Sequence, residues 1–251
     1  PTIATVSPAP IERLTSSRMV SIPSGLVTCL RKLRASRTVF LSMRRAIVLL
    51  LLWVAAASPA QSAAPPVILV LGDSLSAGYG LAPGQGWVSL LQQRLKKEGY
   101  GHRVVNASVS GETTDGGLAR LDRALATHNP GIVVLELGAN DGLRGLPVSR
   151  VETNLGLLIT KSRAAGAEVL LLTVQMPTNY GPQYTTSYQK IYDDLRSRYK
   201  VGAAAIMSPE MALDLTYFLA DGIHPNARAQ PLLLNNVWGQ LTPLLRRQSN
   251  P

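Results

Sequence analysis

Two short stretches of the chain carry residue types that together can perform nucleophilic catalysis. In the first, an apolar run at residues 67–71 ends in a Gly-Asp-Ser sequence, which places Ser74 directly after a predicted buried strand. In the second, Asp221 stands three residues before His224. At this spacing the carboxylate can accept a hydrogen bond from Nδ1 of the imidazole, and Nε2 is left free to take a proton from a serine. Ser74, His224 and Asp221 are therefore candidates for a nucleophile, its base and the acid that orients the base.

Each stretch alone also has a purely structural interpretation. A serine after a strand is commonly a turn residue or a helix N-cap, and an isolated Asp-x-x-His sequence commonly caps a helix. Two further positions, Gly111 and Asn140, lie between the two stretches, each in a loop that follows a predicted strand. The combination in this order favours catalysis over four unrelated structural roles.

The elements that must position these residues alternate between strands and helices. Apolar runs predict strands at 67–71, 103–106, 131–137, 168–173 and 203–207, and helical periodicity predicts helices near 87–97, 114–127, 149–165, 184–199 and 227–245. The runs at 132–135 and 169–172 are apolar throughout, which is typical of parallel strands buried between helices. With right-handed crossovers, the prediction is an α/β fold: one three-layer α/β/α sandwich with a five-stranded parallel sheet, starting near Pro65.

Polar loops follow three of these strands. They occupy residues 106–112, 138–142 and 175–181, and each contains glycine or polar side chains. Because the carboxyl ends of parallel strands share one edge of a sheet, we expect the backbone of Gly111 and the side chain of Asn140 to face Ser74.

Four sequence blocks make the region from residue 67 to 246 resemble the GDSL, or SGNH, hydrolase family. The blocks are Gly72-Asp73-Ser74-Leu75-Ser76, Ser110-Gly111-Glu112-Thr113, Gly138-Ala139-Asn140-Asp141 and Asp221-Gly222-Ile223-His224-Pro225. The connecting sequence is most similar to the bacterial branch of multifunctional acyl-thioesterase, lysophospholipase and arylesterase enzymes. The resemblance implies a flavodoxin-like sheet and a hydrolase of acyl esters and thioesters.

The resemblance also implies a role for each matched residue. Ser74 would attack an acyl carbonyl, His224 would act as general base and then acid, and Asp221 would orient the imidazole. The oxyanion hole would consist of the backbone N–H groups of Ser74 and Gly111 and the side-chain amide of Asn140. Asp73 has no step in this mechanism and is predicted to be structural.

Apolar loop residues are expected to form the walls of the cleft, although any of them could serve only in packing. Such walls suit an acyl chain or an aryl group better than a sugar. The candidates are Leu75, Leu143, Leu146, Met176, Pro177 and Tyr180.

The charge distribution argues against a nucleic-acid partner. The net charge is +10, but residues 1–60 hold eight of the 25 Lys and Arg residues and one of the 15 acids. Seven of the ten excess charges thus lie in this first segment, and the remainder of the chain is almost neutral, without a basic stripe interleaved with aromatic residues.

Metal and cofactor sites are not expected. The single cysteine, Cys29, lies in the first segment, so the predicted mature domain has no thiol nucleophile, disulfide or cysteine ligand. His102 and His128 lack companion ligands and are predicted to be surface residues.

The first segment itself is expected to be a targeting sequence. Arg44 and Arg45 precede an apolar run at 46–57 and a small-residue site near Ala60, which is the pattern of a signal peptide over residues 43–60. Residues 1–42 are interpreted as a disordered or mis-started extension. The hydrolase domain would then span 61–251 and be periplasmic or secreted, without a stable membrane span; an uncleaved membrane anchor is the alternative.

Two other functions remain open. A non-catalytic flavin- or nucleotide-binding module would explain the glycines at 78–84, but their spacing departs from the dinucleotide-binding fingerprint, and such a module leaves Asp221 and His224 unexplained. A carbohydrate O-deacetylase would use the same machinery and differ only in substrate. A small-molecule acyl ester or thioester is the expected substrate class.

Overall fold

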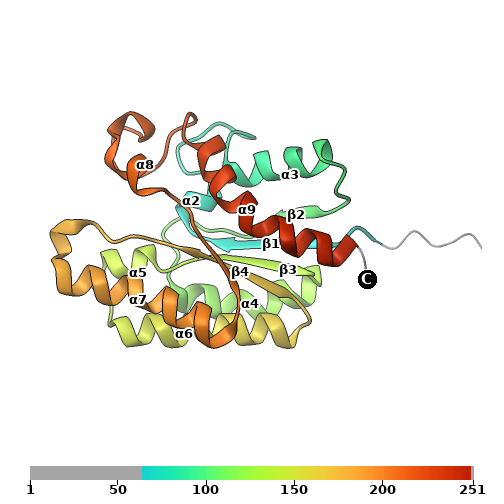
Figure 1. Ribbon diagram of the computed structural model, residues 1–251, viewed down its shortest axis with the longest axis horizontal. Coiled ribbons are helices and arrows are strands. Elements are labelled where there is room, and N and C mark those ends of the chain that lie inside the picture. Colours follow the sequence, from blue (N-terminus) through green and yellow to red (C-terminus); the bar gives the residue numbers. More distant parts are fainter. Residues whose placement is uncertain (1–63, 250–251) are drawn as a thin grey trace, which may run out of the picture. The chain divides into compact units, whose positions relative to one another are not determined.

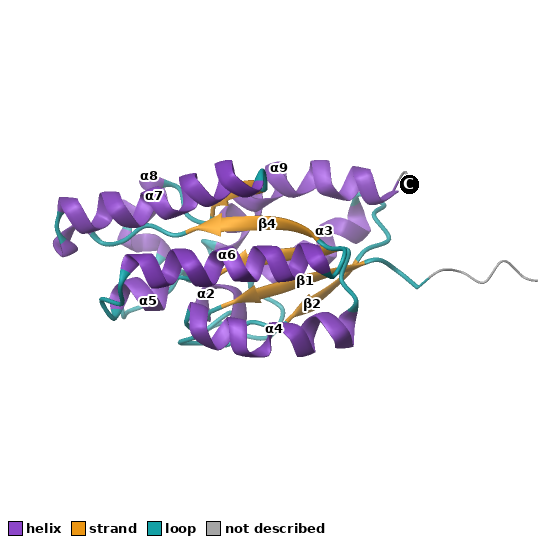
Figure 2. Cartoon of the chain, turned by 90° about the horizontal axis from the view of Figure 1, so that it is seen from below, coloured by secondary structure: helices purple, strands orange, loops and turns teal. Residues whose placement is uncertain are grey.

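The computed structural model describes residues 64–249. Its centre is a five-stranded parallel sheet in the order β2-β1-β3-β4-β5, and Figure 2 shows the strand arrows pointing the same way. The predicted α/β class and parallel sheet are confirmed. The strands are β1 Val67–Gly72, β2 Arg103–Asn106, β3 Ile132–Glu136, β4 Glu168–Thr173 and β5 Gly202–Ala205.

Helices cover both faces of this sheet (Figure 1). One layer consists of α3 (Trp87–Lys97) and α9 (Gln230–Ser249), and the other consists of α4 (Thr114–His128), α6 (Val148–Ala164) and α7 (Pro182–Tyr199). Short elements lie in the connections: α2 Ser74–Ala77, α5 Ala139–Leu143, η1 Thr178–Tyr180, α8 Pro209–Leu213 and η2 Leu215–Tyr217.

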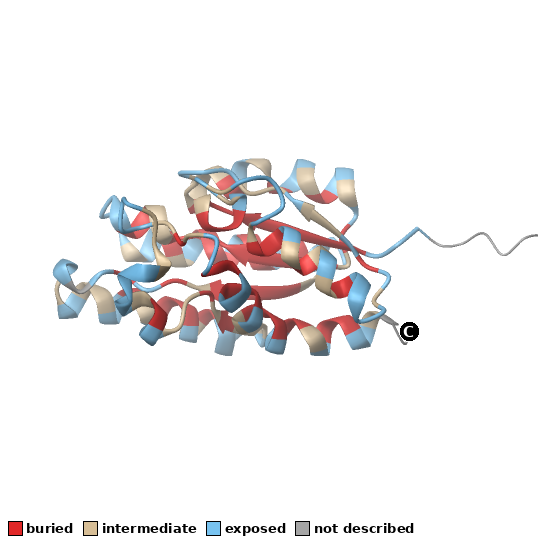
Figure 3. Cartoon of the chain, turned by 90° about the horizontal axis from the view of Figure 1, so that it is seen from above, coloured by how far each residue is buried: buried red, intermediate tan, exposed pale blue. Residues whose placement is uncertain are grey.

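The central strands are apolar on both faces because a helix layer covers each face. Every residue of β1 and β3 is buried, and the sheet forms the buried interior in Figure 3. Leu69 of β1 pairs with Val105 on one side and Val133 on the other. This arrangement explains why the runs at 67–71 and 132–135 contain no polar residue.

The strand order locates the site. The chain leaves β1 toward β2 and then returns to place β3 on the other side of β1, so the connections from β1 and β3 diverge at their carboxyl ends. Ligands of doubly wound sheets bind in the crevice at such a switch point. Ser74 follows β1 and Asn140 lies just after β3, so both predicted site residues lie at this crevice.

The local structure differs from the sequence-based expectation at three points. The short helices α2, α5 and α8 were not predicted, because four or five residues are too few to show a helical period. The last helix begins at Gln230 rather than 227 and continues to Ser249. His102 is not a surface residue: only 3% of it is exposed, it packs edge-on against Tyr100, and burial lowers its pKa.

The predicted extension at 1–42 and the predicted signal peptide at 43–60 lie outside the described residues. Within residues 64–249, no helix has the length and apolar character required to span a membrane.

Candidate active site

Ser74 is the first residue of helix α2, directly after the end of β1. The Asp73 carboxylate caps this helix, and its Oδ1 accepts a hydrogen bond from the N–H of Leu75 at 3.0 Å. Gly72 is required before the cap because a Cβ there would lie 2.7 Å from Oε2 of Glu136. In the Gly-Asp-Ser sequence, Gly72 thus allows the close approach of Glu136, Asp73 caps α2, and Ser74 supplies the hydroxyl.

Asp221 and His224 lie in a turn between two antiparallel segments. The N–H of Leu219 donates to the carbonyl of His224 at 2.8 Å, which closes the turn. Oδ1 of Asp221 accepts hydrogen bonds from the N–H groups of Ile223 and His224 at 2.9 and 3.0 Å. These backbone donors and the imidazole lower the pKa of Asp221 to about 2.

The structure brings the three predicted catalytic side chains together. Nε2 of His224 lies 2.9 Å from Oγ of Ser74, and Nδ1 lies 2.7 Å from Oδ2 of Asp221. The imidazole therefore lies between a hydroxyl and an ionised carboxylate. This is the geometry in which a histidine can accept a serine proton and keep the correct tautomer.

Tyr79, which was not identified from the sequence, contacts the imidazole of His224. Its ring centroid lies 4.3 Å from that of His224. Gly80 allows the loop to approach the turn closely, since a Cβ there would lie 2.5 Å from a methyl carbon of Leu219. Nothing in the local sequence indicates this contact, because it depends on how the loop after α2 packs against residues far along the chain.

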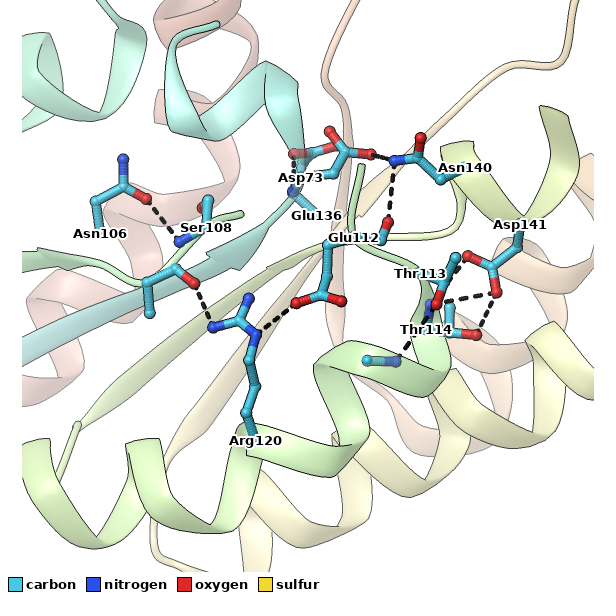
Figure 4. Close-up of polar contacts among 12 residues, drawn as sticks. Asp73, Asn106, Ser108, Glu112, Thr113, Thr114, Arg120, Glu136, Asn140 and Asp141 are labelled. Carbon is cyan, nitrogen blue, oxygen red and sulfur yellow. Dashed lines mark hydrogen bonds and ion pairs between the residues drawn. The ribbon is translucent and has the colours of Figure 1, made fainter. Parts of the chain in front are cut away.

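Asn140 lies in helix α5, and its amide group has two hydrogen-bond partners (Figure 4). Nδ2 donates to Oδ2 of Asp73 at 3.1 Å and to the carbonyl of Glu112 at 2.9 Å. The amide of Asn140 is therefore held between the cap of α2 and the loop that contains Gly111.

The loop that contains Gly111 is fixed at both of its ends. The N–H of Val109 donates to the carbonyl of Gly72 at 3.0 Å, which ties the loop to the end of β1. Farther along, the carboxylate of Glu112 pairs with Arg120 at 2.6 Å (Figure 4). Gly111 itself has a φ of 77°, a conformation that favours glycine, and its carbonyl accepts a hydrogen bond from Arg144 at 2.9 Å.

A second carboxyl group, that of Glu136, lies behind the candidate nucleophile. Its Oε2 accepts hydrogen bonds from the N–H of Asp73 at 3.3 Å and from Oγ of Ser76 at 2.8 Å. Burial raises the pKa of Asp73 to about 6, and burial together with the charge of Asp73 raises the pKa of Glu136 well above its ordinary value. Glu136 was not identified from the sequence; an acid that ends an otherwise apolar strand was the available signal.

The six predicted wall residues separate into two groups. Leu143 and Tyr180 are each 38% exposed, Pro177 is exposed and Leu146 is half-buried. Leu75 and Met176 instead belong to the hydrophobic core, with 9% and 8% exposed, so they offer little surface to a ligand. Met176 is buried because it packs against Gly142, where a Cβ would lie 2.1 Å from its sulfur.

Among residues 64–249, no group of three or more His, Cys, Asp or Glu side chains is arranged to hold a metal ion. The polar groups at the crevice are the serine, the imidazole, the carboxylates and the amide described above, which can transfer protons and bind an oxyanion.

The sequence is similar to that of known esterases and thioesterases. The model of the GDSL-like Lipase/Acylhydrolase family matches residues 70–231. Esterase TesA of Pseudomonas aeruginosa is 49% identical over 178 residues, which cover 71% of this chain and 89% of that protein. Thioesterase 1/protease 1/lysophospholipase L1 of Escherichia coli K12 is 40% identical over 182 residues, which cover 72% of this chain and 86% of that protein.

A solved structure has the same fold. The psychrotrophic esterase EstA from a Pseudoalteromonas species, in a crystal structure inhibited by monoethylphosphonate, superposes with a TM-score of 0.68 at 39% identity and covers 72% of this chain and 98% of that one. The region matched by the family model includes the Gly-Asp-Ser segment and the Asp221–His224 turn. The chain belongs to the GDSL-like lipase/acylhydrolase family.

Proposed function

We propose that this chain hydrolyses acyl esters and thioesters, with Ser74 as nucleophile, His224 as general base and acid, and Asp221 as the residue that orients the imidazole. One observation carries the proposal: hydrogen-bond distances of 2.9 and 2.7 Å connect the Ser74 hydroxyl, the His224 imidazole and the Asp221 carboxylate in series. The relatives named esterase and thioesterase support the reaction class.

In the first half of the reaction, Oγ of Ser74 bonds to the acyl carbon while Nε2 of His224 takes the hydroxyl proton. The tetrahedral intermediate collapses, the bond to the leaving oxygen or sulfur breaks, and His224 returns the proton to that atom. In the second half, water attacks the acyl-enzyme with His224 again as base. The products are a carboxylic acid and an alcohol or thiol, and Ser74 regains its proton.

The oxyanion of each intermediate would be bound by the N–H groups of Ser74 and Gly111 and by Nδ2 of Asn140. Each correctly aimed donor is worth roughly 3 kcal/mol of transition-state stabilisation. Both hydrogens of Nδ2 are donated in the structure, to Oδ2 of Asp73 at 3.1 Å and to the carbonyl of Glu112 at 2.9 Å. In this proposal the oxyanion replaces Asp73 as the partner in the longer bond, while the bond to Glu112 keeps the amide in place.

The exposed apolar residues favour an acyl chain or aryl group as the part of the substrate that is bound beside the reacting carbonyl. Leu143, Pro177 and Tyr180 offer accessible surface, and Leu146 is partly accessible. We expect esters of medium or long acyl chains to be better substrates than acetyl esters. A preference for acetyl groups on sugars would instead indicate the carbohydrate O-deacetylase.

The test compares the protein with its Ser74→Ala variant on p-nitrophenyl esters from acetyl to palmitoyl. Loss of the nucleophile should lower kcat by about 10⁴-fold or more. Ser89→Ala is the matched control, because Ser89 is an exposed serine on α3. Equal rates for Ser74→Ala and Ser89→Ala would refute the assignment.

The proposal includes export. Residues 43–60 would be removed as a signal peptide, residues 1–42 would form no part of the fold, and the domain from residue 61 would act in the periplasm or outside the cell on small-molecule substrates. Amino-terminal sequencing of the exported protein tests this: a start near Gln61 supports cleavage, and an intact segment 49–52 contradicts it.

A further inference from the structure

Four tyrosines lie at every fourth position along η1 and α7, and their rings follow one another along the helix. We call them the tyrosine ladder: Tyr180, Tyr184, Tyr188 and Tyr192. Successive ring centroids are 5.8, 5.6 and 6.3 Å apart. A stripe of aromatic residues at this spacing is ordinary for a helix that packs on a core, so packing alone would explain the rings.

The hydroxyl groups show a pattern that packing does not require. Each one donates a hydrogen bond to a backbone carbonyl of the same short segment, residues 137–143, two before Asn140 and two after it. The pairs are Tyr192 with Leu137 at 3.1 Å, Tyr188 with Gly138, Tyr184 with Gly142 at 3.1 Å and Tyr180 with Leu143 at 2.9 Å. Phenylalanines would fill the same space without making any of these bonds.

The segment is shaped to receive these hydroxyls. Gly138 has a φ of 117°, and a Cβ there would lie 2.4 Å from the hydroxyl oxygen of Tyr192. A Cβ on Gly142 would lie 3.0 Å from Cζ of Tyr188. A side chain at Gly138 would collide with the ladder, and one at Gly142 would collide with the sulfur of Met176 and lie tightly against Tyr188. Both glycines therefore permit the close approach.

Burial divides the ladder into an inner and an outer half. Tyr188 and Tyr192 are 0% exposed, whereas Tyr184 is half-buried and Tyr180 is 38% exposed. Burial raises the pKa of Tyr184, Tyr188 and Tyr192 above that of an ordinary tyrosine, so these hydroxyls remain protonated donors at neutral pH. A buried carbonyl that loses a donor is costly, which makes the inner pair the stronger anchor, although the carbonyl of Gly138 also accepts from the N–H of Gly142 at 3.0 Å.

We infer that the tyrosine ladder positions Asn140 for catalysis by holding the backbone on both sides of it. The inference rests on the proposed function, in which Asn140 binds the oxyanion. The side chain of Asn140 is held by Asp73 and Glu112, and the ladder supplies the complementary constraint on its main chain. The tyrosines do not touch the reacting atoms in this account; they act through Asn140.

The test measures kcat and KM of Tyr188→Phe and Tyr192→Phe on a p-nitrophenyl ester. A displacement of about 1 Å can cost roughly 100-fold in rate, so a partial release of Asn140 should lower kcat by about 10-fold and leave KM almost unchanged. Tyr199→Phe is the matched control: Tyr199 lies on the same helix, but its hydroxyl is directed at Gly156 of α6. Its kcat should equal that of the unmodified protein.

The same substitutions in an Asn140→Ala background separate positioning from general destabilisation. If the ladder acts through Asn140, Tyr188→Phe should have almost no further effect on kcat once the amide is gone. Two results would overturn the role of the ladder alone. One is that Tyr188→Phe lowers kcat in the Asn140→Ala background as much as it does in the unmodified protein. The other is that kcat is unchanged in all ladder variants while Asn140→Ala is slow. Unchanged kcat in Asn140→Ala itself would overturn the oxyanion assignment and the ladder's role with it. Tyr184 is less buried, so Tyr184→Phe should fold even if Tyr188→Phe and Tyr192→Phe do not.

Discussion

Asp73 and Asp221 belong to the same site but lie in different environments. Asp73 stands at the end of β1 with 1% exposed, and its pKa is raised to about 6 by burial. The side chain of Asp221 is 35% exposed, and its pKa is lowered to about 2 by two backbone donors and the imidazole. Direct N–H donors keep a carboxylate ionised, whereas burial favours the protonated acid.

This difference fits the different roles proposed for the two carboxylates. An acid that orients a catalytic histidine must be charged throughout the working pH range, and Asp221 meets that requirement. Burial beside Glu136 raises the pKa of Asp73, and its carboxyl group caps α2 and accepts a hydrogen bond from Asn140. Asp73 therefore has the structural role predicted for it, and in addition it contacts Asn140, a proposed oxyanion residue.

The largest expected effect is that of Asp221→Asn. The amide keeps the shape of the side chain but removes the charge that stabilises the imidazolium, so kcat should fall by about 10⁴-fold. Asp214→Asn is the matched control, because Asp214 caps η2 with a comparable bond to the N–H of Thr216 at 2.9 Å. Similar losses in the two variants would show that removing either capping carboxylate disrupts this part of the chain, and would contradict a specific role for Asp221.

A smaller effect is expected from Asp73→Asn. Asparagine is also a good N-cap, so helix α2 should persist. The new amide cannot serve Leu75 and Asn140 equally well, since only one of its two atoms accepts. We expect kcat to fall by about 10-fold, well below the loss from Asp221→Asn. A loss as large as that of Asp221→Asn would contradict the division of roles.

The smallest effect concerns the pH dependence of stability. Because the pKa of Asp73 is raised above its ordinary value of 3.8, its contribution to stability is fully present below pH 3.8 and is lost as pH rises through about 6. The loss should be at most about 3 kcal/mol. For Asp221 the sign is opposite: its contribution is present above pH 3.8 and is lost as pH falls toward 2.

Urea unfolding at pH 4 to 7 tests this prediction. The free energy of unfolding of Asp73→Asn should improve relative to the unmodified protein as pH rises. Parallel curves for the two proteins would show that Asp73 is not perturbed as described.

The sequence was sufficient for the features that depend on local pattern. Apolar runs predicted all five strands. The three-residue spacing of Asp221 and His224 predicted the contact between their side chains, because a single turn of the chain brings the two residues together. The membership of Leu75 and Met176 in the core could not be predicted, since it depends on which helix covers each loop.

Contacts between distant segments account for most of what was missed. Tyr79, Glu136 and the bonds of the tyrosine ladder all arise where parts far apart in the chain pack together. The regular spacing of the tyrosines was visible in the sequence, but it gave no indication of which carbonyls their hydroxyls would meet.

Covalent labelling tests the central claim most directly. The protein is treated with a fluorophosphonate, which reacts with activated serines, and the modified peptide is mapped by mass spectrometry. We expect one adduct per chain, on Ser74, and strongly slowed labelling in His224→Ala. An adduct on another residue, or ester hydrolysis that continues with Ser74 blocked, would contradict the assignment of Ser74 as the nucleophile.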